Sequence, residues 1–60
     1  MKRYEIFCGN LSWNGFMGWT TGIGQAFWTM ESAQEACDSL QERYLDAVLH
    51  IEEVPYHDGI

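Results

Sequence analysis

The first residues alternate in polarity as a β-strand does. Over residues 2–8 the two faces of this predicted strand carry Tyr4, Ile6 and Cys8 on one side and Arg3, Glu5 and Phe7 on the other. Gly9-Asn10 then interrupts the alternation as a bulge or a strand end. Asn14-Gly15 is the strongest short hairpin signal, because both central residues of a type I′ turn need positive φ. It predicts Trp13 opposite Phe16, with the next strand over about residues 16–21.

The clearest predicted element is a helix from Met30 to about Tyr44. Thr29 is a good N-cap, and Ser32 with Glu35 offers a capping box one turn later. The apolar positions repeat at helical spacing on one face, namely Ala33, Ala36, Cys37, Leu40 and Tyr44. Before the helix, residues 22–24 break the chain. Residues 25–28 either continue the preceding strand after a kink or form a short strand of their own.

The last predicted strand covers residues 47–55 and ends at Pro55. Its two faces are Ala47, Leu49 and Ile51 toward the core, and Val48, His50 and Glu52 away from it. Residues 55–60 read as a tail of a single domain, 1–60. The order ββ(β)αβ predicts an α+β fold, in which one helix packs on a three- or four-stranded, mainly antiparallel sheet.

The composition limits the kinds of protein this chain can be. With 60 residues it makes one domain, and 47% apolar residues are too many for a disordered chain. No apolar run approaches the length of a membrane span, and the N-terminus lacks the apolar core of a signal peptide. We therefore expect a cytosolic protein that binds no membrane, with Cys8 and Cys37 as buried thiols rather than a disulfide.

The net charge of −6 is unevenly distributed. From residue 31 onward, the chain has eight aspartates and glutamates but one arginine, Arg43, and no lysine. Four of the acids are spaced by 4, 3 and 4 residues and fall on one helix face, and a fifth extends the row. This acidic row consists of Glu31, Glu35, Asp38, Glu42 and Asp46. It argues against direct nucleic-acid binding and favours a partner with a basic surface. An ordinary solvated helix face is the alternative interpretation.

The aromatic residues are too numerous for one helix to cover. Phe7 and some of Trp13, Met17, Trp19 and Trp28 are expected on the sheet face that the helix leaves bare. The expected patch for partner binding is Trp13, Phe16, Trp19 and Trp28, since large aromatics dominate interface energies. Packing of the aromatics on one another is the alternative.

The candidate catalytic and metal-binding patterns are weak. Residues 22–27 imitate the start of a dinucleotide fingerprint, but Phe27 replaces its last glycine and no βαβ unit follows. Cys8, Cys37, His50 and His57 lack the close spacing of small zinc modules. Cys37 with His50 has no third group or oxyanion signature to support nucleophilic catalysis. The sequence predicts no catalytic residues, metal or cofactor.

In size, acidity and this ββαβ layout, the chain resembles small phage-encoded inhibitors of host machinery, anti-CRISPR proteins among them. The resemblance implies an inhibitor, in the host cytosol, that occupies a basic, nucleic-acid-binding surface of a host complex such as a CRISPR effector. The acidic row would mimic nucleic acid, with Trp13, Phe16 and Trp19 as anchors. The alternatives are a homodimeric or subunit-type interaction module and, more weakly, a ligand or metal site around Cys8, Cys37 and His50.

Overall fold

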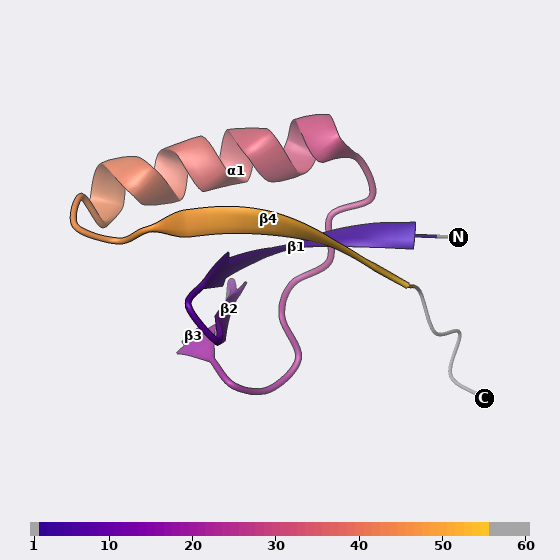
Figure 1. Cartoon of the computed structure of the whole chain (residues 1–60), viewed down its shortest axis with the longest axis horizontal. Helices are drawn as coiled ribbons and strands as arrows, with labels where there is room; N and C mark the ends of the chain where they lie inside the picture. The colour runs from indigo at the N-terminus through magenta and orange to yellow at the C-terminus, as the bar shows by residue number, and fades with distance from the viewer. Residues whose placement is uncertain (1, 56–60) are drawn as a thin grey trace.

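A single helix packs on a four-stranded antiparallel sheet in this computed structural model, which describes residues 2–55 (Figure 1). The elements in chain order are β1 (Lys2–Cys8), β2 (Leu11–Asn14), β3 (Gly18–Thr20), α1 (Met30–Arg43) and β4 (Leu49–Pro55). The strand order across the sheet is β3-β2-β1-β4. The predicted α+β fold is confirmed, with the sheet in its four-stranded form. Residues 56–60 of the predicted tail lie outside the described residues.

The core lies between α1 and the sheet. Ile6 of β1 is fully buried and packs with Cys37 and Leu40 of the helix. Partly buried residues surround this cluster, namely Trp13, Trp19, Phe27, Ala36, Tyr44, Leu49 and Ile51. The predicted inward faces of β1 and β4 are therefore confirmed at Ile6, Leu49 and Ile51.

The helix begins and ends where its sequence signals lie. The Thr29 side chain accepts a hydrogen bond from the backbone N–H of Ser32, which satisfies one of the unpaired donors of the first turn. The predicted capping box at Ser32 and Glu35 falls inside the helix, so Thr29 is the cap. At the other end, the backbone N–H of Tyr44 donates to the carbonyl of Leu40.

The predicted type I′ turn at Asn14-Gly15 is wrong. In the β2–β3 hairpin Asn14 pairs with Gly18 and Trp13 with Trp19, so Trp13 does not lie opposite Phe16. The Asn14 side-chain oxygen accepts hydrogen bonds from the backbone N–H groups of Phe16 and Met17, at 2.8 and 3.1 Å. Gly18 has a φ of +77°, a conformation that glycine adopts at no steric cost. These contacts stabilise a three-residue loop in place of the two-residue turn.

The tight hairpin of this protein is at Gly9-Asn10 instead. Cys8 of β1 pairs with Leu11 of β2, which leaves two residues for the turn. Gly9 has a φ of +64° and Asn10 a negative φ, as in type II′ turns with glycine first. The interruption predicted here is thus a chain reversal that joins two neighbouring strands.

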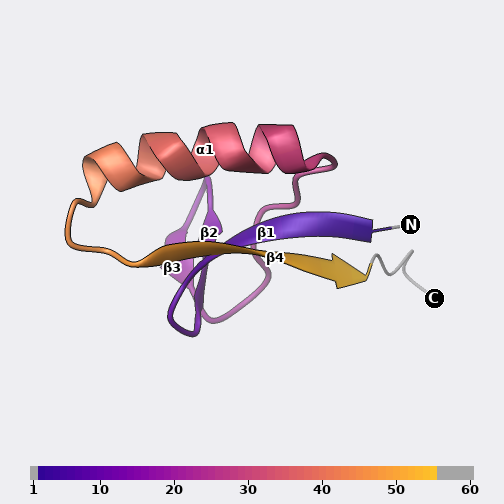
Figure 2. The ribbon, with the colours of Figure 1, turned by 45° about the horizontal axis from the view of Figure 1, so that its top comes forward.

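Residues 25–28 form neither a continued strand nor a separate one. Phe27 makes a single antiparallel bridge to Tyr4, with both backbone hydrogen bonds at 2.8 Å. The backbone N–H of Gln25 donates to the carbonyl of Trp13. β2 pairs with β1 only near Phe7 and Cys8, and the segment before α1 runs beside the earlier part of β1. It then continues into the helix (Figure 2).

Candidate interaction surface

The acidic row lies on the solvent side of α1 and the turn that follows it. All five carboxylate residues are exposed, whereas the buried helix positions are Ala33, Cys37 and Leu40. Within the row, the Asp38 carboxylate accepts a hydrogen bond at 3.0 Å from the Gln34 side chain one turn earlier. The four helix members of the row therefore share the solvent side of α1, and Asp46 is exposed in the turn beyond its end.

Arg43, the one lysine or arginine between positions 31 and 55, is turned toward the aromatic side chains. Its guanidinium carbon lies 5.8 Å from the ring centre of Trp13 and 5.4 Å from that of Tyr44. Cation–π contacts of this length hold the charge over the rings. At 100° per residue, Arg43 and Asp38 leave the helix on opposite flanks, so Arg43 does not interleave the acidic row.

Trp13 and Trp19 face the helix rather than the bare side of the sheet. Their rings meet edge to face at 5.2 Å, and the Tyr44 ring lies 6.2 and 5.9 Å from them. The cause is the pleat, because Trp13 follows Leu11 by two residues and Leu11 pairs with Cys8, on the same face as Ile6. Both tryptophans are partly buried against the core. This agrees with the alternative interpretation of the sequence, in which the aromatic residues pack on one another.

Two of the exposed large apolar residues, Phe16 and Met17, lie in the loop of the β2–β3 hairpin, whereas Met30, Leu45 and Val48 lie at the ends of α1 and before β4. Phe16 is fully exposed and Met17 is exposed beside it, and after β3 the carbonyl of the exposed Ile23 accepts a hydrogen bond from the Asn14 side chain at 3.1 Å. An open depression of about 430 Å³ lies here, lined by Asn14, Gly15, Phe16 and Gln25. Trp28, the fourth residue of the predicted aromatic patch, is exposed just before the N-cap of α1.

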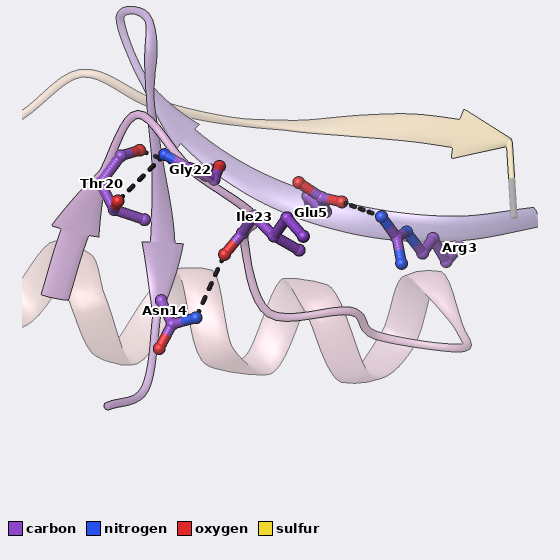
Figure 3. Close-up of polar contacts among 7 residues, drawn as sticks. Arg3, Glu5, Asn14, Thr20, Gly22 and Ile23 are labelled. Carbon is purple, nitrogen blue, oxygen red and sulfur yellow. Dashed lines mark hydrogen bonds and ion pairs between the residues drawn. The ribbon is translucent and has the colours of Figure 1, made fainter. Parts of the chain in front are cut away.

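The face of the sheet opposite α1 is not bare, because the β3–α1 segment crosses part of it (Figure 3). Gly24 is buried here, and a Cβ on it would lie 2.8 Å from atoms of Glu5 and Ser12. The Ser12 hydroxyl lies 3.3 Å from the carbonyl oxygens of Thr20 and Gly22. Under this cover, Glu5 is buried and pairs with Arg3 at 3.0 Å.

Glu5 and Ser12 are the residues whose setting sequence reasoning missed. Alternation placed Glu5 on the sheet face opposite the helix, and a lone helix was expected to leave that face to solvent. The only sequence signal for a cover was Gly22-Ile23-Gly24, whose glycines allow a close backbone approach. Phe7, expected on this face, lies there and stacks on His50 with the ring centres 5.6 Å apart.

The cysteines and histidines offer no metal centre in the described part of the chain. In residues 2–55, His, Cys, Asp and Glu do not gather in groups of three that could hold a metal ion. His50 lies instead 2.6 Å from the Glu52 carboxylate. Cys8 and Cys37 are free thiols, and His57 lies outside the described residues.

Cys37 gives the structure a testable pH dependence. Burial, and then the neighbouring Asp38 carboxylate, raises the pKa of the Cys37 thiol above its ordinary value. The folded state therefore disfavours the thiolate, and stability should fall as pH rises through about 8.5, where a free thiol is half ionised. We expect the free energy of unfolding, measured by urea denaturation, to fall more steeply with pH in the wild type than in Cys37→Ala. Parallel pH profiles would contradict this assignment.

None of the helical structure in residues 2–55 has the length and apolar character needed to cross a lipid bilayer. Comparisons of the chain with protein-family models, with curated proteins and with solved structures found no match.

Proposed function

We propose that this chain is a small binding protein that inhibits its target by occupying a basic, nucleic-acid-binding surface of a host complex such as a CRISPR effector. The observation that carries the proposal is the acidic row, exposed along α1 and uninterrupted by any basic side chain. The protein acts by binding and performs no catalysis.

The acidic row supplies the attraction. Carboxylates one helical turn apart are 5–6 Å from one another, about the scale of phosphate spacing along a nucleic-acid strand. Like charges at these spacings cost roughly 0.2–0.5 kcal/mol of helix stability per pair, so the row is not explained by helix stability. Arg43 is held over Trp13 and Tyr44, so its positive charge lies to the side of the row and not within it. The negative field of the row attracts a Lys/Arg-lined groove and speeds the encounter.

The hairpin tip supplies the apolar contact. Trp13 and Trp19 are partly buried and hold the hairpin against α1, which leaves Phe16 as the exposed aromatic of the loop. A fully exposed phenylalanine on a loop held by the Asn14 side chain is a preorganised anchor for a pocket on the partner. The row and the tip lie on different parts of the surface, so they would contact different parts of the partner.

The test is to neutralise the centre of the row. A partner is first captured from a bacterial host lysate and purified, and its binding is then titrated with the wild type and with Glu35→Gln/Asp38→Asn/Glu42→Gln. We expect the triple variant to bind at least about tenfold more weakly, mainly through a slower association rate, and with a smaller dependence on salt. The wild type should also displace the partner's nucleic acid.

Two controls accompany this titration. Ser39→Ala changes the exposed side of the same helix without altering its charge and should bind like the wild type. The triple variant should be at least as stable as the wild type, because neutralisation relieves like-charge repulsion. If its affinity for the purified partner is unchanged, the acidic row is only a solvated helix face.

The exposed apolar residues favour a second candidate, a homodimeric interaction module. Phe16, Met17 and Ile23 would be buried between two copies of the chain. A doubled mass in sedimentation equilibrium that Phe16→Ser returns to the monomer value would support this candidate. A monomer at millimolar concentration would exclude it.

A further inference from the structure

The register between β1 and β4 determines which backbone N–H and C=O groups of β4 point to the open edge of the sheet. β4 is last in the strand order and pairs with β1 over its whole length. On β1, both the N–H and the C=O of Tyr4 bond to Phe27, on the side away from β4. In an antiparallel ladder these groups alternate in direction from residue to residue. Arg3, Glu5 and Phe7 therefore bond to β4, and Tyr4 and Ile6 do not.

The same alternation then applies to β4 itself. Its residues opposite Arg3, Glu5 and Phe7 are Val54, Glu52 and His50, and these direct their backbone groups inward. Leu49 and Ile51, opposite Cys8 and Ile6, direct theirs outward, to the open side of the sheet. Pro55 agrees with this parity, because it falls at an outward position, where a missing N–H costs no hydrogen bond within the sheet. The outward groups of Leu49 and Ile51 can therefore pair with another strand.

The charge around this edge favours one kind of added strand over others. Between residues 31 and 55 the one lysine or arginine, Arg43, is turned to the opposite flank of α1, over Trp13. A strand added to β4 would lie beneath the Asp38 flank of the helix on one face, and on the other beside the exposed Glu52, whose carboxylate also contacts the His50 ring at 2.6 Å. Cross-strand pairs of opposite charge stabilise a sheet, and like charges destabilise it. Lysine and arginine side chains on both faces of the added strand would fit.

Pairing of two copies through this edge meets an electrostatic obstacle. An antiparallel pair of β4 strands would place both helices on the same face of one continuous sheet. Because α1 lies over β1 and β4 (Figure 1), strands about 4.8 Å apart would bring the two helices within roughly 10–15 Å. Their acidic rows would then adjoin in two chains that each carry a net charge of −6. The edge therefore suits a basic partner better than a second copy.

We propose that the β4 edge binds an extended segment of the partner, rich in lysine or arginine, as a fifth strand of the sheet. This inference rests on the proposed function and specifies how the basic partner is engaged. Main-chain hydrogen bonds to Leu49 and Ile51 would supply affinity, and the flanking carboxylates would supply the preference for basic residues.

The test uses two synthetic octapeptides, each with four lysines. One is the Lys-Val peptide, Lys-Lys-Val-Val repeated twice, which puts lysines on both faces of a strand. The other is Lys-Lys-Pro-Pro repeated twice, whose adjacent prolines remove N–H groups from both sides of a strand. Amide hydrogen exchange of the whole chain is followed by NMR in low-salt buffer. With the Lys-Val peptide at saturation, we expect exchange at Leu49 and Ile51 to slow by about tenfold or more. The inward amides of His50 and Glu52 should be protected from the start.

The outcomes separate this inference from the proposed function. If both peptides shift the signals of Glu35 and Asp38 equally and neither slows exchange at Leu49 or Ile51, the attraction is electrostatic only, and the fifth strand is rejected while the proposed function stands. If exchange at these amides slows with rising protein concentration without peptide, the edge pairs with a second copy. If neither peptide produces any response, both the fifth strand and the basic partner are contradicted.

Discussion

Replacing Ile6 with alanine is expected to remove most of the folding stability of this protein. Ile6 is fully buried between the sheet and α1, where it packs on Cys37 and Leu40. Shortening a buried isoleucine to alanine costs about 2–5 kcal/mol, through lost burial and the cavity left behind. A chain of 60 residues has a total stability of only about 3–9 kcal/mol. Urea denaturation followed by tryptophan fluorescence should show a midpoint near zero denaturant.

The chain offers a matched control for this substitution. Ile23 is the same residue type but 78% exposed, and Ile23→Ala should change the free energy of unfolding by no more than about 0.5 kcal/mol. Ile6→Val should fall between the two, at about 0.5–1.5 kcal/mol. Equal losses for Ile6→Ala and Ile23→Ala would mean that the core does not lie where the structure places it.

Gly24→Ala is expected to destabilise the fold by about 1–3 kcal/mol, although it adds a single methyl group. That group would lie 2.8 Å from a Glu5 carboxylate oxygen and from both side-chain heavy atoms of Ser12, closer than a Cβ atom approaches such neighbours in proteins. The crossing segment would have to lift from the sheet, which would expose Glu5 and separate it from its cover. Besides a lower denaturation midpoint, we expect faster amide exchange at Gln25 and Phe27, whose backbone N–H groups bond to Trp13 and Tyr4.

Gly22→Ala is the control for this second prediction. A Cβ at Gly22 would lie 3.4 Å from the Thr20 hydroxyl, a contact within the ordinary range. It should therefore lower stability clearly less than Gly24→Ala. If Gly24→Ala unfolds at the same urea concentration as the wild type, the β3–α1 segment does not cover Glu5 and Ser12.

The acidic row and the aromatic patch differ in how well the local sequence predicts them. The acidic row follows from spacing alone, because residues three and four apart must share a face of any helix. The aromatic patch does not, because whether Trp13 and Trp19 face α1 or solvent depends on the register of two hairpins. A shift of one residue in that register would turn both side chains to the opposite face. The pairing of Cys8 with Leu11 sets the face of Trp13, and the loop held by Asn14 and Gly18 places Trp19 opposite it, whereas the Asn-Gly pair favoured a different turn.

The sequence by itself determined the elements with strong local causes. Interactions among near neighbours are enough to produce three of them. These are the alternating strand over residues 2–8, the helix with its Thr29 cap and apolar face, and the strand that ends at Pro55. Only the tertiary structure decided what depends on distant contacts, namely the path of the β3–α1 segment across Glu5, the packing of Arg43 on Trp13, and the outward backbone of Leu49 and Ile51. The physical reason is that such contacts join residues far apart in the chain. Which of these residues meet depends on the register of the strands and on which face of the sheet the helix leaves uncovered.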